Sequence, residues 1–90
     1  MDKIFMVYAD FSLDSSKAAE FHNNIAFNFN ITDWWNHIPG LYFIKTKLSL
    51  HEVSFGIRNS FGEDRLIIAE IHPDQVDGNL PPEAWQWFSK

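Results

Sequence analysis

The stretch Leu48-Ser49-Leu50-His51-Glu52-Val53 has the full pattern of a helix start. Ser49 at the N-cap position can accept a hydrogen bond from the backbone N–H of Glu52, and the Glu52 side chain can reach back to the Ser49 backbone. Leu48 and Val53 stand on either side of this capping box, at the spacing of a hydrophobic staple. The stretch therefore predicts where a helix begins.

The end of this helix is marked as well. Apolar residues recur at helical spacing along the following segment, at Leu50, Val53, Ile57 and Phe61. Gly62 comes next, at the position of a C-cap glycine. We predict a helix over 49–61, and its two marked ends help to assign the segments around it.

Strand and helix patterns alternate along the rest of the chain. Residues 3–10 are apolar on both parities, which is typical of a central strand buried on both faces. A turn over 11–16 and a helix to about Phe27 follow. The strands 34–37 and 41–46 flank Ile38-Pro39-Gly40, which has the pattern of a tight hairpin turn. The last strand is 65–71, and Pro81-Pro82 opens a short helix after it. Residues 28–33 are left unassigned.

This order predicts an α+β fold, a ferredoxin-like β-α-β-β-α-β sandwich with a short aromatic C-terminal tail. It forms one domain over 1–90, with its core in 3–72 and the tail in 73–90. Right-handed crossovers place the first and third strands parallel at the sheet centre, with the fourth and second at the edges. Two helices cover one face, and either the tail aromatics or a second subunit covers the other. Because an open apolar face or edge favours association, we expect a homodimer.

Composition narrows the classes of function. The 90 residues contain no Cys, which excludes disulfides and thiolate zinc sites, and their net charge is −5. The seven Lys and Arg residues are thinly spread, although Lys45 and Lys47 are close together, so a nucleic-acid partner is disfavoured. From the residue pattern we expect neither a signal peptide nor a membrane-spanning helix. We expect a cytoplasmic protein with no membrane partner.

Several motifs resemble known families. The run Val7-Tyr8-Ala9-Asp10 resembles the end of the first strand in CRISPR-adaptation nuclease-like proteins. Four further segments resemble proteins of the SinR family: Asp33-Trp34-Trp35-Asn36-His37, Leu41 to Ser49, Asp64-Arg65-Leu66, and Leu80-Pro81-Pro82-Glu83-Ala84-Trp85-Gln86-Trp87. The resemblance covers most of the chain outside 14–32.

The resemblance implies a ferredoxin-like homodimer and one candidate metal ligand. In the nuclease relatives, the first-strand aspartate of each subunit faces its twin across the two-fold axis. Only Asp10 matches that residue, and the pair would hold Mg²⁺ or Mn²⁺ that activates water against a phosphodiester. The residue before Asp10 is Ala9, where the family has tyrosine, and the tyrosine stands one place earlier at Tyr8. This departure weakens the transfer of a catalytic role.

Asp10 also has a structural interpretation. In the predicted topology, Asp64 and Arg65 lie near the end of the first strand, and a parallel third strand brings Lys45 and Lys47 to the same end. Asp10 is then a charge-paired residue that helps to start the following loop. The four histidines, His22, His37, His51 and His72, stand in different elements without zinc-site spacing.

Aromatic residues are the other candidates for binding: Trp34, Trp35, Tyr42, Trp85 and Trp87. Indoles stack on nucleobases, but they also fill cores and interfaces. Neighbouring strand residues point to opposite faces, so only one of Trp34 and Trp35 enters a given core.

Two functions follow from these residues. The first is a non-catalytic dimeric interaction module without a cofactor, which binds a protein or a small ligand through an aromatic surface. The alternative is a divalent-metal-dependent nuclease with paired Asp10 residues. The acidic charge and the lone carboxylate favour the first.

Overall fold

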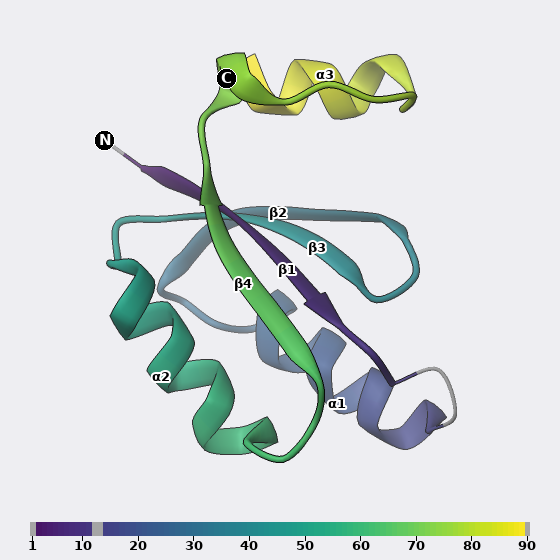
Figure 1. Cartoon of the computed structure of the whole chain (residues 1–90), viewed down its shortest axis with the longest axis vertical. Coiled ribbons are helices and arrows are strands. Elements are labelled where there is room, and N and C mark those ends of the chain that lie inside the picture. Colours follow the sequence, from purple (N-terminus) through teal and green to yellow (C-terminus); the bar gives the residue numbers. More distant parts are fainter. Residues whose placement is uncertain (1, 12–13, 90) are drawn as a thin grey trace.

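The computed structural model describes residues 2–11 and 14–89. These residues form an α+β fold with a four-stranded antiparallel sheet, three α-helices and one short 3-10 helix (Figure 1). The elements in chain order are β1 (Lys3–Ala9), α1 (Ser15–Ala26), β2 (Ile31–Ile38), β3 (Leu41–Thr46), α2 (Leu50–Phe61), β4 (Leu66–Ile71), the 3-10 helix η1 (Pro73–Gln75) and α3 (Pro82–Ser89).

The strand order is β2-β3-β1-β4, so β1 and β3 lie at the centre of the sheet as predicted. The prediction that these two strands run parallel is wrong. They are antiparallel, with Ile4 opposite Lys45 and Tyr8 opposite Leu41. The hairpin explains the difference: the α1 crossover returns β2 parallel to β1, and β3, which turns back between them, must run opposite to both.

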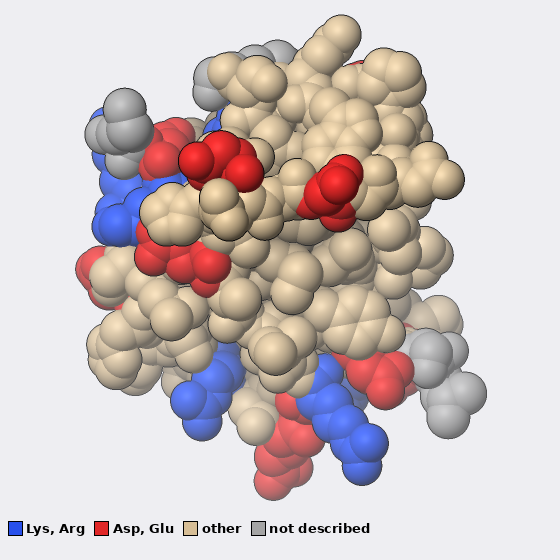
Figure 2. Space-filling view, turned by 45° about the horizontal axis from the view of Figure 1, so that its top comes forward, with Lys and Arg blue, Asp and Glu red and all other residues tan. Residues whose placement is uncertain are grey.

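This direction separates charges that the predicted topology brought together. Lys45 lies opposite Ile4, so Lys45 and Lys47 belong to the start of β1 and not to its end at Asp10. The expected proximity of β4 is confirmed, because the Asp10 backbone N–H donates to the Arg65 carbonyl at 3.0 Å. On the face drawn in Figure 2, the Lys and Arg side chains lie toward the left and lower margins, and Asp and Glu side chains interrupt the tan surface between them.

The capping box of α2 is present as predicted. The backbone N–H of Glu52 donates to Ser49 Oγ at 3.2 Å, and the backbone N–H of Ser49 donates to Glu52 Oε1 at 3.0 Å. Val53 is buried, and Leu48 packs against the same cluster, as a staple requires. Gly62 is the C-cap, but its φ of −60° is right-handed, so its place does not depend on a left-handed conformation.

The helix α1 begins nearer the start of the chain than predicted. Asp14 is its N-cap and accepts from the backbone N–H of Lys17, while residues 12 and 13 of the predicted turn lie outside the described residues. The unassigned segment 28–33 contains a turn, after which β2 starts at Ile31.

Two apolar clusters lie on opposite faces of the sheet. The larger one, the helix-side cluster, joins β1 and β3 to α1 and α2, and it contains Phe5, Val7, Phe21, Ile44, Ile57 and Phe61. The smaller one, the α3-side cluster, joins the other face to α3, and it contains Ile4, Trp35, Phe43, Ala84, Trp87 and Phe88. The tail therefore covers the second face, as one of the two sequence alternatives proposed (Figure 1).

Candidate functional site: a pocket at the end of β1

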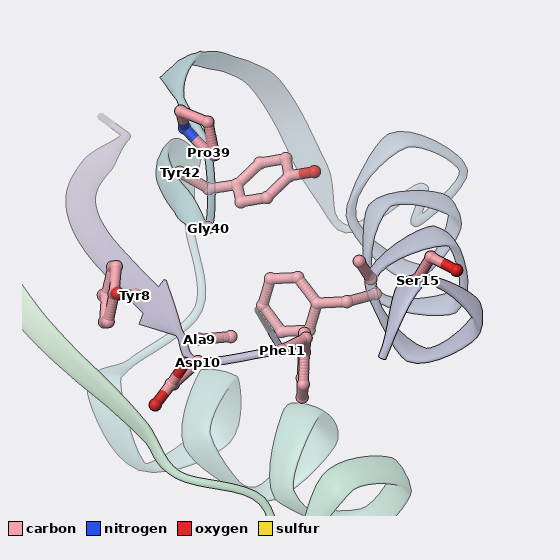
Figure 3. Close-up of a pocket in the computed structure, with 10 residues that line it drawn as sticks. Tyr8, Ala9, Asp10, Phe11, Ser15, Pro39, Gly40 and Tyr42 are labelled. Atoms are coloured by element: carbon pink, nitrogen blue, oxygen red, sulfur yellow. The ribbon is translucent and has the colours of Figure 1, made fainter. Parts of the chain in front are cut away.

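A cavity of about 320 Å³ lies at the carboxyl end of β1, between α1 and the β2–β3 turn (Figure 3). Its lining is mainly apolar and aromatic, with a few polar groups. The lining residues come from four places in the chain: Tyr8, Ala9, Asp10 and Phe11; Ser15, Ala18 and Phe21; Pro39 and Gly40; and Tyr42. Binding pockets in proteins have volumes of about 300–1,000 Å³ and this kind of lining. The cavity is therefore large enough for a small molecule.

The β2–β3 turn forms one side of this pocket. Its centre is Pro39 and Gly40, as the predicted hairpin turn requires. The carbonyl of Gly40 accepts from the backbone N–H of Ala9 at 2.9 Å, which holds the turn against the end of β1. Gly40 has a φ of +79°, and a Cβ at this position would lie 2.7 Å from the Ala9 carbonyl oxygen. Only glycine permits both this conformation and this close approach.

Tyr42 reaches from β3 toward α1 across the pocket (Figure 3). Its side chain is buried, and its hydroxyl shares a hydrogen bond of 2.7 Å with Nδ1 of His22 on α1. Burial raises the pKa of Tyr42 above its ordinary value of 10.0, so the hydroxyl is neutral near pH 7. Trp34 makes an edge contact with the His22 ring, at 5.1 Å between centroids. His22 and Trp34 together fix the ring of Tyr42 as a wall of the cavity.

Asp10 lies on the pocket rim and is exposed. In Figure 3 its carboxylate points away from the rings of Phe11 and Tyr42. Asp10 is the only acidic residue among those that line the pocket, and no three His, Asp or Glu residues of residues 2–11 and 14–89 come together to hold a metal ion. Within a single chain, the described residues therefore do not assemble the Mg²⁺ or Mn²⁺ site of the nuclease alternative.

The other aromatic candidates lie away from this pocket. Trp34 packs against the helix-side cluster and Trp35 lies in the α3-side cluster, which confirms that the two indoles point to opposite faces. Trp35 and Trp87 are both buried, and their rings meet edge to face with centroids 6.2 Å apart. Trp85 is half-buried at the margin of the same cluster. Of the predicted binding residues, only Tyr42 lines the pocket, and Asp10, the candidate metal ligand, lies on its rim.

Lys45 is part of the α3-side packing and is not positioned as a surface phosphate contact. Its side chain is 8% exposed, and Nζ donates to the Trp87 carbonyl at 2.6 Å. The same ammonium lies 4.3 Å from the centroid of the Trp87 ring, within the range of a cation–π interaction. Lys45 therefore connects β3 to α3, and only Lys47 of the pair remains on the surface.

Sequence reasoning missed Tyr8, Phe11 and Gly40 as pocket residues. The Pro39-Gly40 pair was identified as a turn, but the turn alone does not show which strand end it contacts. That contact depends on the antiparallel pairing of β1 with β3, which the sequence-based topology had reversed.

Comparison of the chain with protein-family models, with curated proteins and with solved structures gave no match. In the described part of the chain, none of the helices has the length and apolar character needed to cross a membrane.

Proposed function

We propose that this protein is a small, non-catalytic binding module that takes a largely apolar small ligand in the pocket at the end of β1. The observation that carries the proposal is the cavity itself, about 320 Å³ in volume and walled by Phe11, Phe21 and Tyr42. Aromatic walls offer large contact areas to a ring or an aliphatic chain. This pocket takes the place of the aromatic surface expected from the sequence, and it contains Tyr42 from that set of residues.

The polar groups of the pocket favour a ligand with one polar end. Apart from Tyr42, the polar lining residues are Tyr8, Asp10 and Ser15, and the other lining residues are apolar. A neutral Tyr42 hydroxyl already engaged by His22 adds little further polarity. A one- or two-ring compound with a hydroxyl or amine substituent therefore fits this chemistry better than a polyanion.

The module is also proposed to be a cytoplasmic homodimer with a ferredoxin-like arrangement. The β-α-β-β-α-β order and the packing of α1 and α2 in one cluster support the arrangement. The free side of β4, at one end of the strand order, supports association. A protein partner in place of a small ligand remains the second form of the same proposal.

The nuclease alternative has less support. It requires Asp10 from two chains to meet at a two-fold axis and a basic track for phosphate beside them. The carboxylate of Asp10 has no acidic neighbour in the pocket lining, and Lys45 belongs to the opposite end of β1. Cleavage of DNA or RNA with Mg²⁺ or Mn²⁺ that is lost in Asp10→Asn would replace the binding proposal with this one.

The test of ligand binding uses two alanines on one helix. Ala18 and Ala19 are both exposed on α1, but only Ala18 lines the pocket. Ala18→Phe places a ring in the cavity, and Ala19→Phe adds the same ring outside it. We expect indole, phenol or benzyl alcohol to shift the amide resonances of Ala9 and Gly40 in the wild type. Binding should weaken at least about tenfold in Ala18→Phe and stay unchanged in Ala19→Phe.

Shifts that survive equally in both variants would place the ligand elsewhere and contradict the pocket proposal. Absence of shifts with all three probes and with a wider set of one- and two-ring compounds would contradict small-ligand binding. Circular dichroism of both variants checks that the added ring leaves the fold intact.

A further inference from the structure

The strand β4 has one paired side and one free side. It pairs with β1 and is the last strand in the order β2-β3-β1-β4. The backbone N–H of Asp10 donates to the Arg65 carbonyl, so Arg65 and the odd-numbered residues of β4 direct their N–H and C=O groups toward β1. By the alternation of an antiparallel ladder, the N–H and C=O groups of Leu66, Ile68 and Glu70 point outward. No strand of the described chain pairs with them.

A groove of about 540 Å³ runs between this free edge and α2. Ser54 and Arg58 line it from the helix, and Leu66 and Ile68 line it from the strand. Arg58 is exposed, and it forms no ion pair with any described residue. The groove therefore combines an apolar floor, a free strand edge and one cation.

Glu70 provides the complementary charge on the same face of the sheet. It lies opposite Phe5, a member of the helix-side cluster, so its side chain projects on the side of α1 and α2. Leu66 and Ile68 share that side and pack against the same cluster. Glu70 is exposed and, among the described residues, has no ion-pair partner.

We propose that a second copy of this chain pairs antiparallel with the free edge of β4, with the two-fold axis at Ile68. Residues opposite each other in a sheet point to the same face. A two-fold axis perpendicular to the sheet therefore pairs even-numbered residues of β4 with even-numbered residues of the second copy, and odd-numbered with odd-numbered. An axis at Ile68 places Leu66 opposite Glu70 of the second copy and satisfies the outward groups of all three residues. It also forms one continuous eight-stranded sheet.

This register brings opposite charges together twice. Arg58 and Leu66 line the same groove, so Glu70 of the second copy, opposite Leu66, enters the groove that contains Arg58. Symmetry repeats the contact on the other side of the axis. A strand from an unrelated protein would need an acidic residue at this position by coincidence, whereas this chain supplies its own. The inference rests on the homodimer of the proposed function and names its surface.

The test reverses each charge singly and then both together. Arg58→Glu and Glu70→Arg place like charges in both grooves, and each should weaken dimerisation at least about tenfold. The double variant restores opposite charges and should return the dimer Kd to within about threefold of the wild-type value. Lys47→Glu and Glu83→Arg are matched controls, because these exposed residues do not line the groove and should not change the Kd. Sedimentation velocity over a dilution series at low and high salt measures the effect.

Three results would overturn the inference. A dimer Kd that neither single reversal changes rules out pairing through β4, and so does a double variant whose Kd stays weak. Either result leaves the homodimer itself in place. A wild-type chain that stays monomeric throughout rules out both the edge pairing and the homodimer, and leaves the edge to an extended segment of another protein. Ligand binding in the β1 pocket is measured separately, so its failure is distinguishable from either result.

Discussion

Gly40 permits the conformation of the β2–β3 turn and also lines one side of the candidate pocket. Its φ of +79° costs a residue with a Cβ about 1–2 kcal/mol, and the Cβ would also press on the Ala9 carbonyl oxygen at 2.7 Å. We expect Gly40→Ala to lower the free energy of unfolding by about 2 kcal/mol or more. Urea titration followed by circular dichroism measures this loss.

Gly56 provides the control for this substitution. It lies within α2, where a Cβ would meet nothing within 4 Å. Gly56→Ala should therefore raise the free energy of unfolding by about 0.5–1 kcal/mol, because alanine favours the helix. Equal effects at the two glycines would contradict the account of the turn.

The capping box of α2 is an element-scale feature with a pH signature. The backbone N–H of Ser49 lowers the pKa of Glu52 from its ordinary value of 4.5, and the Ser49 side chain lowers it further. A carboxyl whose pKa is lower in the folded state stabilises the fold above its unfolded pKa, and this contribution is lost as pH falls through the folded value. The box therefore contributes fully at neutral pH.

We expect Ser49→Ala to lower the free energy of unfolding by about 1 kcal/mol at pH 7. The deficit should shrink only slightly as the pH falls below 4.5, because alanine keeps the backbone N–H that lowers the pKa of Glu52 most and removes only the smaller effect of the Ser49 side chain. Urea titrations from pH 7 downward measure it. Ser54→Ala, on the same helix but away from its N-terminus, is the control, and a deficit that grows in acid would contradict the account.

At the scale of the whole molecule, α3 completes the second layer. Trp87 is buried against Trp35 and Phe88, and the Lys45 ammonium binds its carbonyl and faces its ring. Trp87→Ala should lower the free energy of unfolding by about 3–5 kcal/mol, a large share of the stability of a small domain. Trp87→Phe should lower it much less, because the buried Trp87 indole N–H has no acceptor among the described residues.

Trp85 is the comparison within the same helix. It is half-buried at the margin of the cluster, so Trp85→Ala should lower the free energy of unfolding less than Trp87→Ala. Urea unfolding followed by circular dichroism measures all three variants. Equal losses at Trp85 and Trp87 would show that α3 does not dock as the structure places it.

The elements themselves were largely predictable because their signals are local. The start of α2, the Pro39-Gly40 turn and the opening of α3 depend on residues within a few positions of one another. The strand direction was not predictable in this way. The prediction joined β1 and β3 as parallel neighbours, although β3 inserts between β1 and β2 and so runs against both.

The sequence alone determined the order of strands and helices, the helix caps and the acidic, cysteine-free composition, since these depend on neighbouring residues or on sums over the chain. Only the tertiary structure decided which distant residues meet. It moved Lys45 from the Asp10 end of the sheet to Trp87, buried Trp35, and placed Tyr42 beside the end of β1. Contacts of this kind depend on register and direction, which no short stretch of sequence encodes.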